Sequence, residues 1–444
     1  MATRKRRKIA RREETSRHFL LSQTHRRKVD DAPDLGADGV RQILIQAFPS
    51  LRCGVDFRQA ALEQMGGGAF VALVIRPDDP LETWMAAPGS DALAGVAARL
   101  DEACRVAGGL WGVEASGLLA GLWPRCNAAE GLDVARRLQE QVHLRTGCTV
   151  TIGVAAHPTL DYAPLEALEN ARKAAEHAAF FGPNSRVAFD AVSLNISGDT
   201  CYERGDIPAA IHEFQKALQL DPQNVNVHNS LGVCYGVLGD HGRALEAFAH
   251  ALSLESGEYM AVYNMGLIHL LQGRREEALE QFLRAGDMHG DIFEIQFQTG
   301  KLRLEMGNPQ AARPLLERAA RMRSRSGNAQ RLLGDCYAEL NLPEKAIGAY
   351  QKAVKVNPGD SLALSALGRL FDERGENPEI AMIFCKESVS LSPQNPLFRK
   401  RLGRLYLKLN RLEEALKEFE QAGLLGQDSA EDIRRVRERM GDQN

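Results

Sequence analysis

The sequence predicts a chain of two parts: a small α/β domain over about residues 39–190, then an all-α array of about seven helical hairpins over residues 191–429. A 34-residue repeat predicts the hairpins. Apolar runs rich in β-forming residues, alternating with amphipathic stretches, predict the α/β domain. A length of 444 residues agrees with more than one domain.

The repeat is marked by several columns of small and large residues. Glycines recur every 34 residues six times, and a seventh follows after 35. These are Gly198, Gly232, Gly266, Gly300, Gly334, Gly368 and Gly403. Alanines keep the same interval from Ala210 to Ala346, and large residues such as Phe214, Phe248 and Tyr350 come four places after them. Small residues at these positions predict two helices in close contact, with the large side chain filling the space between them.

Each repeat also contains a signal for a turn between its two helices. Glycine or asparagine occupies this site, and both residues tolerate the left-handed conformation that ends a helix. The residues are Gly205, Gly239, Gly273, Gly307, Asn341, Gly375 and Asn410. Pro222, Pro358 and Pro393 are predicted to end the second helices of their repeats.

This pattern resembles the tetratricopeptide repeat (TPR) family, whose period is 34 residues. The resemblance implies a superhelix of about seven hairpins with a concave groove that binds a protein partner. Residues 430–444 are polar and helical in pattern, which is typical of a capping helix on the last repeat.

The chain begins with a basic stretch. Residues 1–29 hold eleven lysines and arginines against two glutamates, whereas the whole chain has a net charge of −3. Residues 30–38 contain acidic residues, proline and glycine and are predicted to be a linker. Two interpretations of residues 1–38 remain open: a disordered leader, or an arm with weak electrostatic contact to nucleic acid or an anionic membrane.

Residues 39–190 alternate between predicted helices and strands. We expect strands over residues 69–75, 117–123 and 148–155, and a short one over 185–189. We expect helices over residues 40–48, 91–106, 128–144 and 165–181.

The C-terminal half of this region resembles a GGDEF domain, the fold of diguanylate cyclases. The resemblance is carried by the stretch CTVTIGVAAHPTLDYAPLEALENARKAAEHAAFFGPNSRVAFD, which begins at Cys148. It implies a mixed sheet with flanking helices and, in active members, two guanosine triphosphates and two divalent metals.

The residues that this chemistry requires are replaced. The first metal carboxylate falls at Val74, the next acidic position at Arg76 and the substrate-contacting asparagine at Glu82. Ala115–Leu119 stand where the family has the residues G-G-D-E-F. The acidic position of the late helix is Arg172, and Ala179 takes the place of a phosphate-binding lysine. We therefore expect a degenerate domain that is not an enzyme, with no metal and no cofactor.

Candidate partner-binding residues follow from the TPR resemblance, which places the inward face of each first helix around the repeating glycine. This face is neutral and amide-bearing in repeats one to three and basic in repeats four to seven. The residues are Asn195, Asn229, Tyr263, Asn264, Lys301, Arg331, Arg369, Lys400, Arg401 and Arg404. Arginines suit an acidic or C-terminal-carboxylate peptide. The alternative is a solvated face balanced by Asp335, Asp372 and Glu373.

The sequence thus favours a non-catalytic bacterial scaffold or adaptor in the cytoplasm, with the GGDEF-like domain as an interaction or regulatory module. One alternative is a receptor for a guanine nucleotide or cyclic di-GMP that signals through the array; an active cyclase is disfavoured. No apolar run reaches the roughly 18 residues of a membrane helix. The eight cysteines are scattered, which is typical of reduced thiols in a cytosolic protein.

Purified full-length protein incubated with guanosine triphosphate and Mg²⁺ should form no cyclic di-GMP, because Val74 and Leu118 replace metal-binding carboxylates. Chromatographic assay of the products checks this. Turnover that co-purifies with the protein would contradict it.

Overall fold

The computed structural model describes residues 36–79, 89–375 and 378–441. The chain divides into two compact units, Met1–Asn264 and Met265–Asn444. The basic leader and linker (1–35) and Glu82 lie outside the described residues. No helix in the described part is long and apolar enough to cross a membrane.

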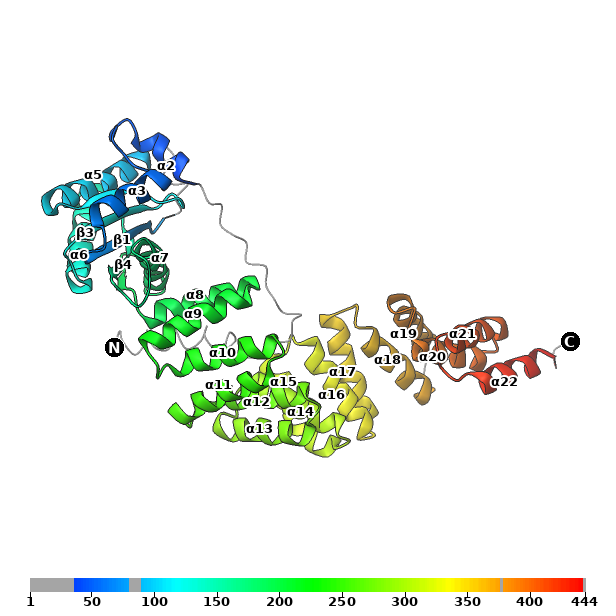
Figure 1. Cartoon of the computed structure of the whole chain (residues 1–444). Coiled ribbons are helices and arrows are strands. Elements are labelled where there is room, and N and C mark those ends of the chain that lie inside the picture. The colour runs from blue at the N-terminus through cyan, green and yellow to red at the C-terminus, as the bar shows by residue number, and fades with distance from the viewer. Residues whose placement is uncertain (1–35, 80–88, 376–377, 442–444) are drawn as a thin grey trace. The chain divides into compact units, whose positions relative to one another are not determined.

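The first unit begins with a five-stranded mixed sheet (Figure 1). Its strands are β1 (Phe70–Pro77), β2 (Leu110–Val113), β3 (Leu119–Pro124), β4 (Val150–His157) and β5 (Arg186–Ala188). The order across the sheet is β2-β3-β1-β4-β5. All neighbours are antiparallel except β4 and β5, which are parallel.

Helices cover both faces of this sheet. They are α2 (Gly36–Leu44), α3 (Gly54–Met65), α5 (Gly89–Ala107), α6 (Ala128–Thr146) and α7 (Glu166–Ala179). Alternate β1 residues point to opposite faces, as strand geometry requires. Val71 and Leu73 lie in the core shared with α5 and α6, while Phe70 and Val74 lie in the core shared with α3 and α7. The predicted mixed sheet with flanking helices is therefore confirmed.

Two elements of this domain were not predicted. Helix α3 lies between Gly54 and Gly66, and its face toward the sheet holds Phe57 and Ala61. Strand β2 has only four residues, one of them glycine, so it is too short to display an alternating pattern. The strand expected from residue 117 begins at Leu119, because Gly117 lies in the turn that joins β2 to β3, with φ of 82°.

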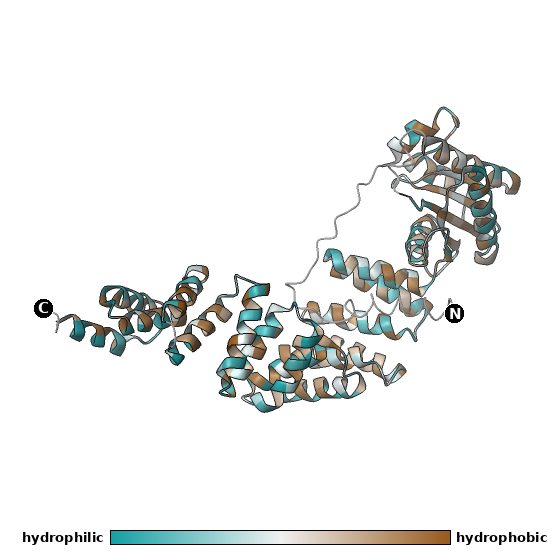
Figure 2. Cartoon of the chain, turned by 180° about the vertical axis from the view of Figure 1, so that it is seen from behind, coloured by the Kyte–Doolittle hydropathy of each residue, from teal (hydrophilic) through white to brown (hydrophobic). Residues whose placement is uncertain are grey.

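Fourteen helices follow as seven pairs, and a single helix comes after them. The pairs are α8 (Ala191–Arg204) with α9 (Ile207–Leu220), α10 (Val225–Val237) with α11 (His241–Leu254), α12 (Tyr259–Leu271) with α13 (Arg275–Met288), α14 (Phe293–Glu305) with α15 (Pro309–Met322), α16 (Gly327–Glu339) with α17 (Pro343–Val356), α18 (Ser361–Arg374) with α19 (Pro378–Leu391), and α20 (Pro396–Lys408) with α21 (Leu412–Leu424). The single helix is α22 (Ala430–Gly441). Figure 2 shows hydrophobic and hydrophilic residues alternating along these helices, as expected for amphipathic helices.

The repeating glycines face the large residues of their own hairpins. A Cβ atom on Gly232 would lie 2.4 Å from the ring of Phe248, and one on Gly334 would lie 2.7 Å from the ring of Tyr350. Real Cβ atoms do not approach other atoms this closely, so only glycine permits this helix spacing. In the sixth hairpin, whose repeat is 35 residues long, Cys385 takes the place of the ring beside Gly368.

The predicted turn residues adopt the left-handed conformation. All five glycines at this site have positive φ, as do both asparagines. Asn341 and Asn410, with φ of 55° and 57°, show that asparagine serves where glycine is replaced. This confirms the prediction that each repeat is a hairpin with a tight turn.

Replacing Ala346 with tryptophan should destabilise the array. Ala346 is fully buried in the core that contains Tyr350 and Leu367, so a large ring overpacks it at a cost of roughly 1–3 kcal/mol or more. Thermal unfolding measures the loss. An unchanged melting curve would mean that the helix contact has been misplaced.

Candidate functional site

Where the GGDEF resemblance would place metal-binding carboxylates, the described residues include Val74, Leu118 and Arg172. Val74 is 1% exposed within β1, and Leu118 is packed against the core beneath the β2–β3 turn. Arg172 pairs with Glu169 at 2.5 Å and also with Glu176, both on its own helix. Among the described residues, no three His, Cys, Asp or Glu side chains are grouped so that they could hold a metal ion.

The first helices of successive hairpins lie beside one another, as α14 with α16 and α18 with α20. The predicted partner-binding residues all belong to first helices. In the first unit, the Asn264 amide donates a 3.0 Å hydrogen bond to the Asn229 side-chain oxygen, and both residues are buried. Tyr263 is 3% exposed, and the buried Oδ1 of Asn195 accepts no hydrogen bond from the described residues.

In the second unit, several predicted cations pair with carboxylates of the chain itself. Lys301 lies 3.7 Å from Glu305, one turn along α14. Arg331 contacts Asp335 at 3.4 Å and Asp360, from the next hairpin, at 3.3 Å. Carboxylates of the protein itself therefore neutralise these cations.

A polar network surrounds Arg331 and continues along the next hairpin. Tyr350 donates a 2.7 Å hydrogen bond to Asp335. Burial raises the pKa of the Asp335 carboxyl, although Tyr350 and Arg331 act in the opposite direction. Arg369, on α18, lies 2.9 Å from Glu373. Two of the acidic residues expected to balance this face, Asp335 and Glu373, thus pair with its cations.

Arg401 differs from these cations because it has no carboxylate partner within the described ranges. Its guanidinium donates a 2.6 Å hydrogen bond to the hydroxyl of Ser365 on α18. Burial lowers the pKa of Arg401, and the nearby Arg369 cation lowers it further. Ser365 and Arg369 are one helical turn apart, so two guanidinium groups gather where α18 meets α20.

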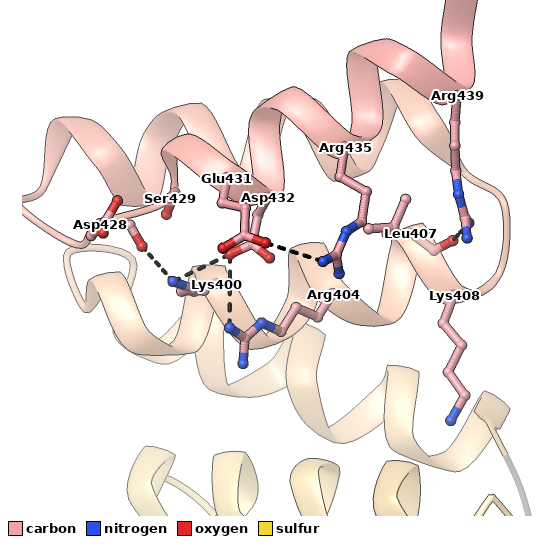
Figure 3. Close-up of a pocket in the computed structure, with 10 residues that line it drawn as sticks. All are labelled: Lys400, Arg404, Leu407, Lys408, Asp428, Ser429, Glu431, Asp432, Arg435 and Arg439. Carbon is pink, nitrogen blue, oxygen red and sulfur yellow. Dashed lines mark hydrogen bonds and ion pairs between the residues drawn. The ribbon is translucent and has the colours of Figure 1, made fainter. Parts of the chain in front are cut away.

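Lys400 and Arg404, also on α20, are paired by the last helix (Figure 3). Asp432 of α22 lies 3.2 Å from Lys400 and 3.8 Å from Arg404. Lys400 also donates to the backbone carbonyl of Asp428. The sequence did not reveal this arrangement because residues 430–444 were expected to act only as a cap. The sequence feature that indicates this arrangement is the four-residue spacing of charged residues on both helices.

Helix α7 joins the sheet domain to the first hairpin. On one side it packs so closely on β4 that a Cβ on Gly153 would lie 1.9 Å from the Ala171 carbonyl. On the other side Lys173 forms a 2.8 Å ion pair with Glu213 of α9, and His177 lies 3.2 Å from the Ser193 hydroxyl of α8. Nine of its fourteen residues are buried, because partners lie on both sides.

Family comparisons match the repeated part of the chain. Models described as "Tetratricopeptide repeat" match residues 235–288, 297–361, 340–396 and 374–440, and one described as "TPR repeat" matches residues 198–239. Together they cover more than half of the sequence. The chain belongs to the tetratricopeptide repeat family. Tetratricopeptide repeats mediate protein–protein interactions.

Solved tetratricopeptide repeat structures resemble parts of this chain. YrrB, described as "a TPR protein with an unusual peptide-binding site", is 21% identical with a TM-score of 0.39, covering 42% of this chain and 95% of that one. PilF of Pseudomonas aeruginosa is 21% identical with a TM-score of 0.42, covering 46% and 92%. A thermophilic TPR protein of Thermus thermophilus is 22% identical with a TM-score of 0.32, covering 40% and 97%. No curated protein matches the chain.

Lys173→Met should destabilise the junction between the sheet domain and the first tetratricopeptide repeat. Lys173 and Glu213 have side chains only 7% and 13% exposed, so the substitution leaves a carboxylate largely desolvated, at a cost of about 3 kcal/mol. Chemical denaturation measures the loss. The double variant Lys173→Met/Glu213→Leu should recover most of it, and failure to recover would show that the ion pair is not the cause.

Proposed function

We propose that this tetratricopeptide repeat protein is a non-catalytic adaptor of the bacterial cytoplasm, and that it binds an acidic segment of a protein partner along the first helices of its second unit. The observation that carries the proposal is Arg401, a partly buried guanidinium that lacks a carboxylate partner among the described residues.

Burial of an unpaired cation costs free energy, and a second cation beside it adds to that cost. Arg369 has one carboxylate partner, Glu373, and Arg401 has only the Ser365 hydroxyl. Arg369 and Arg401 together carry two positive charges, and Glu373 neutralises one of them. One positive charge therefore remains. A carboxylate from a partner would remove the imbalance, and a guanidinium can meet it with two parallel hydrogen bonds.

The sheet domain is proposed to act as an interaction or regulatory module, held against the array by α7. The replacement of carboxylates at Val74 and Leu118 supports a non-catalytic role. Binding of guanosine triphosphate or cyclic di-GMP to the full chain, detected by calorimetry, would favour the alternative of a nucleotide receptor.

Arg401→Met should weaken the binding of a fluorescently labelled oligoglutamate peptide by roughly tenfold, which corresponds to about 1.4 kcal/mol. Methionine retains much of the side-chain bulk and removes the charge. Fluorescence anisotropy with full-length protein measures the affinity.

Lys417→Met is the matched control, since Lys417 is exposed on the second helix of the same hairpin. The control should bind as the unsubstituted protein does. Equal affinity of both variants, with the wild-type melting temperature retained, would refute the role of Arg401.

A further inference from the structure

The last helix forms one wall of a pocket with a volume of about 420 Å³ (Figure 3). The opposite wall is α20, which contributes Lys400, Arg404 and Lys408 at intervals of four residues. Helix α22 contributes Arg435 and Arg439 at the same interval. Residues four apart lie on one face of a helix, so the two rows of cations face the same space.

Most cations of the pocket are paired with carboxylates of the chain itself. Asp432 pairs with Lys400 and Arg404 near the start of both helices. Toward the other end, Lys408 is paired with Asp372 of α18, at 2.8 Å, and Arg435 with Glu431.

Arg439 has no acidic partner within residues 378–441 or the other described ranges; its contact is a 3.5 Å hydrogen bond to the Leu407 carbonyl. The lining as a whole holds five cations and three carboxylates, Asp428, Glu431 and Asp432. Asp372, which lies outside the lining, neutralises Lys408, so an excess of one positive charge remains beside Arg439.

Helix α22 is fixed in this position by apolar packing. Val436 is fully buried, and Ile433 and Met440 pack on the core that contains Leu405 and Phe419. A helix that only shields this core needs polar residues on its outer face. It does not need two arginines directed at the cationic face of α20, where like charges repel.

We propose that α22 has a binding role, and that the pocket between α20 and α22 holds a carboxylate of an acidic peptide segment beside Arg439. The inference rests on the proposed function and extends the binding surface beyond the seven repeats. One carboxylate matches the excess of one positive charge. The three carboxylates in the lining oppose a densely charged polyphosphate or nucleic-acid backbone, and no aromatic side chain in the lining could stack on a base.

The test compares two double variants of the full-length protein. Arg435→Glu/Arg439→Glu reverses the charge inside the pocket. Arg434→Glu/Arg437→Glu makes the same change on the same helix outside it, since Arg434 pairs with Glu438 and Arg437 with Glu420. The pocket variant should bind a labelled oligoglutamate peptide at least ~10-fold more weakly than the control variant.

Retention of the wild-type melting temperature shows that α22 remains docked. If the reversal unfolds the helix, Arg435→Gln/Arg439→Gln removes the cations without adding anions, and it should still weaken binding. Equal binding by the pocket and control variants overturns the inference. If Arg401→Met weakens binding in that case, the proposed function stands without the pocket. If instead the pocket variant binds the peptide more weakly while Arg401→Met binds it as the unsubstituted protein does, the pocket is supported and the role of Arg401 is refuted.

Discussion

The close contact between a glycine on the first helix and a large side chain on the second is the constraint on which each hairpin depends. At Gly232 and Gly334, a single added carbon would collide with the ring of Phe248 or Tyr350. This contact sets the distance between the two helices. Six of the seven hairpins satisfy this constraint with a large side chain, and the sixth satisfies it with Cys385. With the hairpins built alike, first helices such as α18 and α20 lie beside one another, and their side chains meet across the contact.

The placement of charges on those first helices follows from this stacking. Arg331 reaches Asp360 of the next hairpin, Arg401 reaches Ser365 of the preceding one, and Asp432 reaches back from α22 to Lys400. Two sites in the second unit retain an excess of positive charge after these pairings. One is Arg401 beside Arg369, and the other is the pocket between α20 and α22. Both lie on first-helix surfaces, where an acidic segment of a partner could neutralise them.

The repeats could be predicted from sequence because every hairpin reuses the same local rules. In six hairpins glycine faces a large residue sixteen places on, and in every hairpin glycine or asparagine follows the first helix with positive φ. The sheet domain was predicted less completely, since β2 is short and the apolar residues of α3 do not mark a single buried face: Val55 and Leu62 are exposed. The ion pairs of the candidate site could not be predicted in the same way. Partners such as Asp360 and Asp432 come from neighbouring helices, and spacing along one helix does not identify them.

Hydrogen exchange of the full-length protein, with and without a saturating oligoglutamate peptide, tests the central claim most directly. The claim is that acidic segments are bound by the surface formed by the first helices α18 and α20 together with the last helix, α22. The account predicts slower amide exchange in these three helices on addition of the peptide, and unchanged exchange in α19 away from its ends and in strands β1 and β4. Protection confined to the sheet domain or to second helices, with α18, α20 and α22 unaffected, would contradict it.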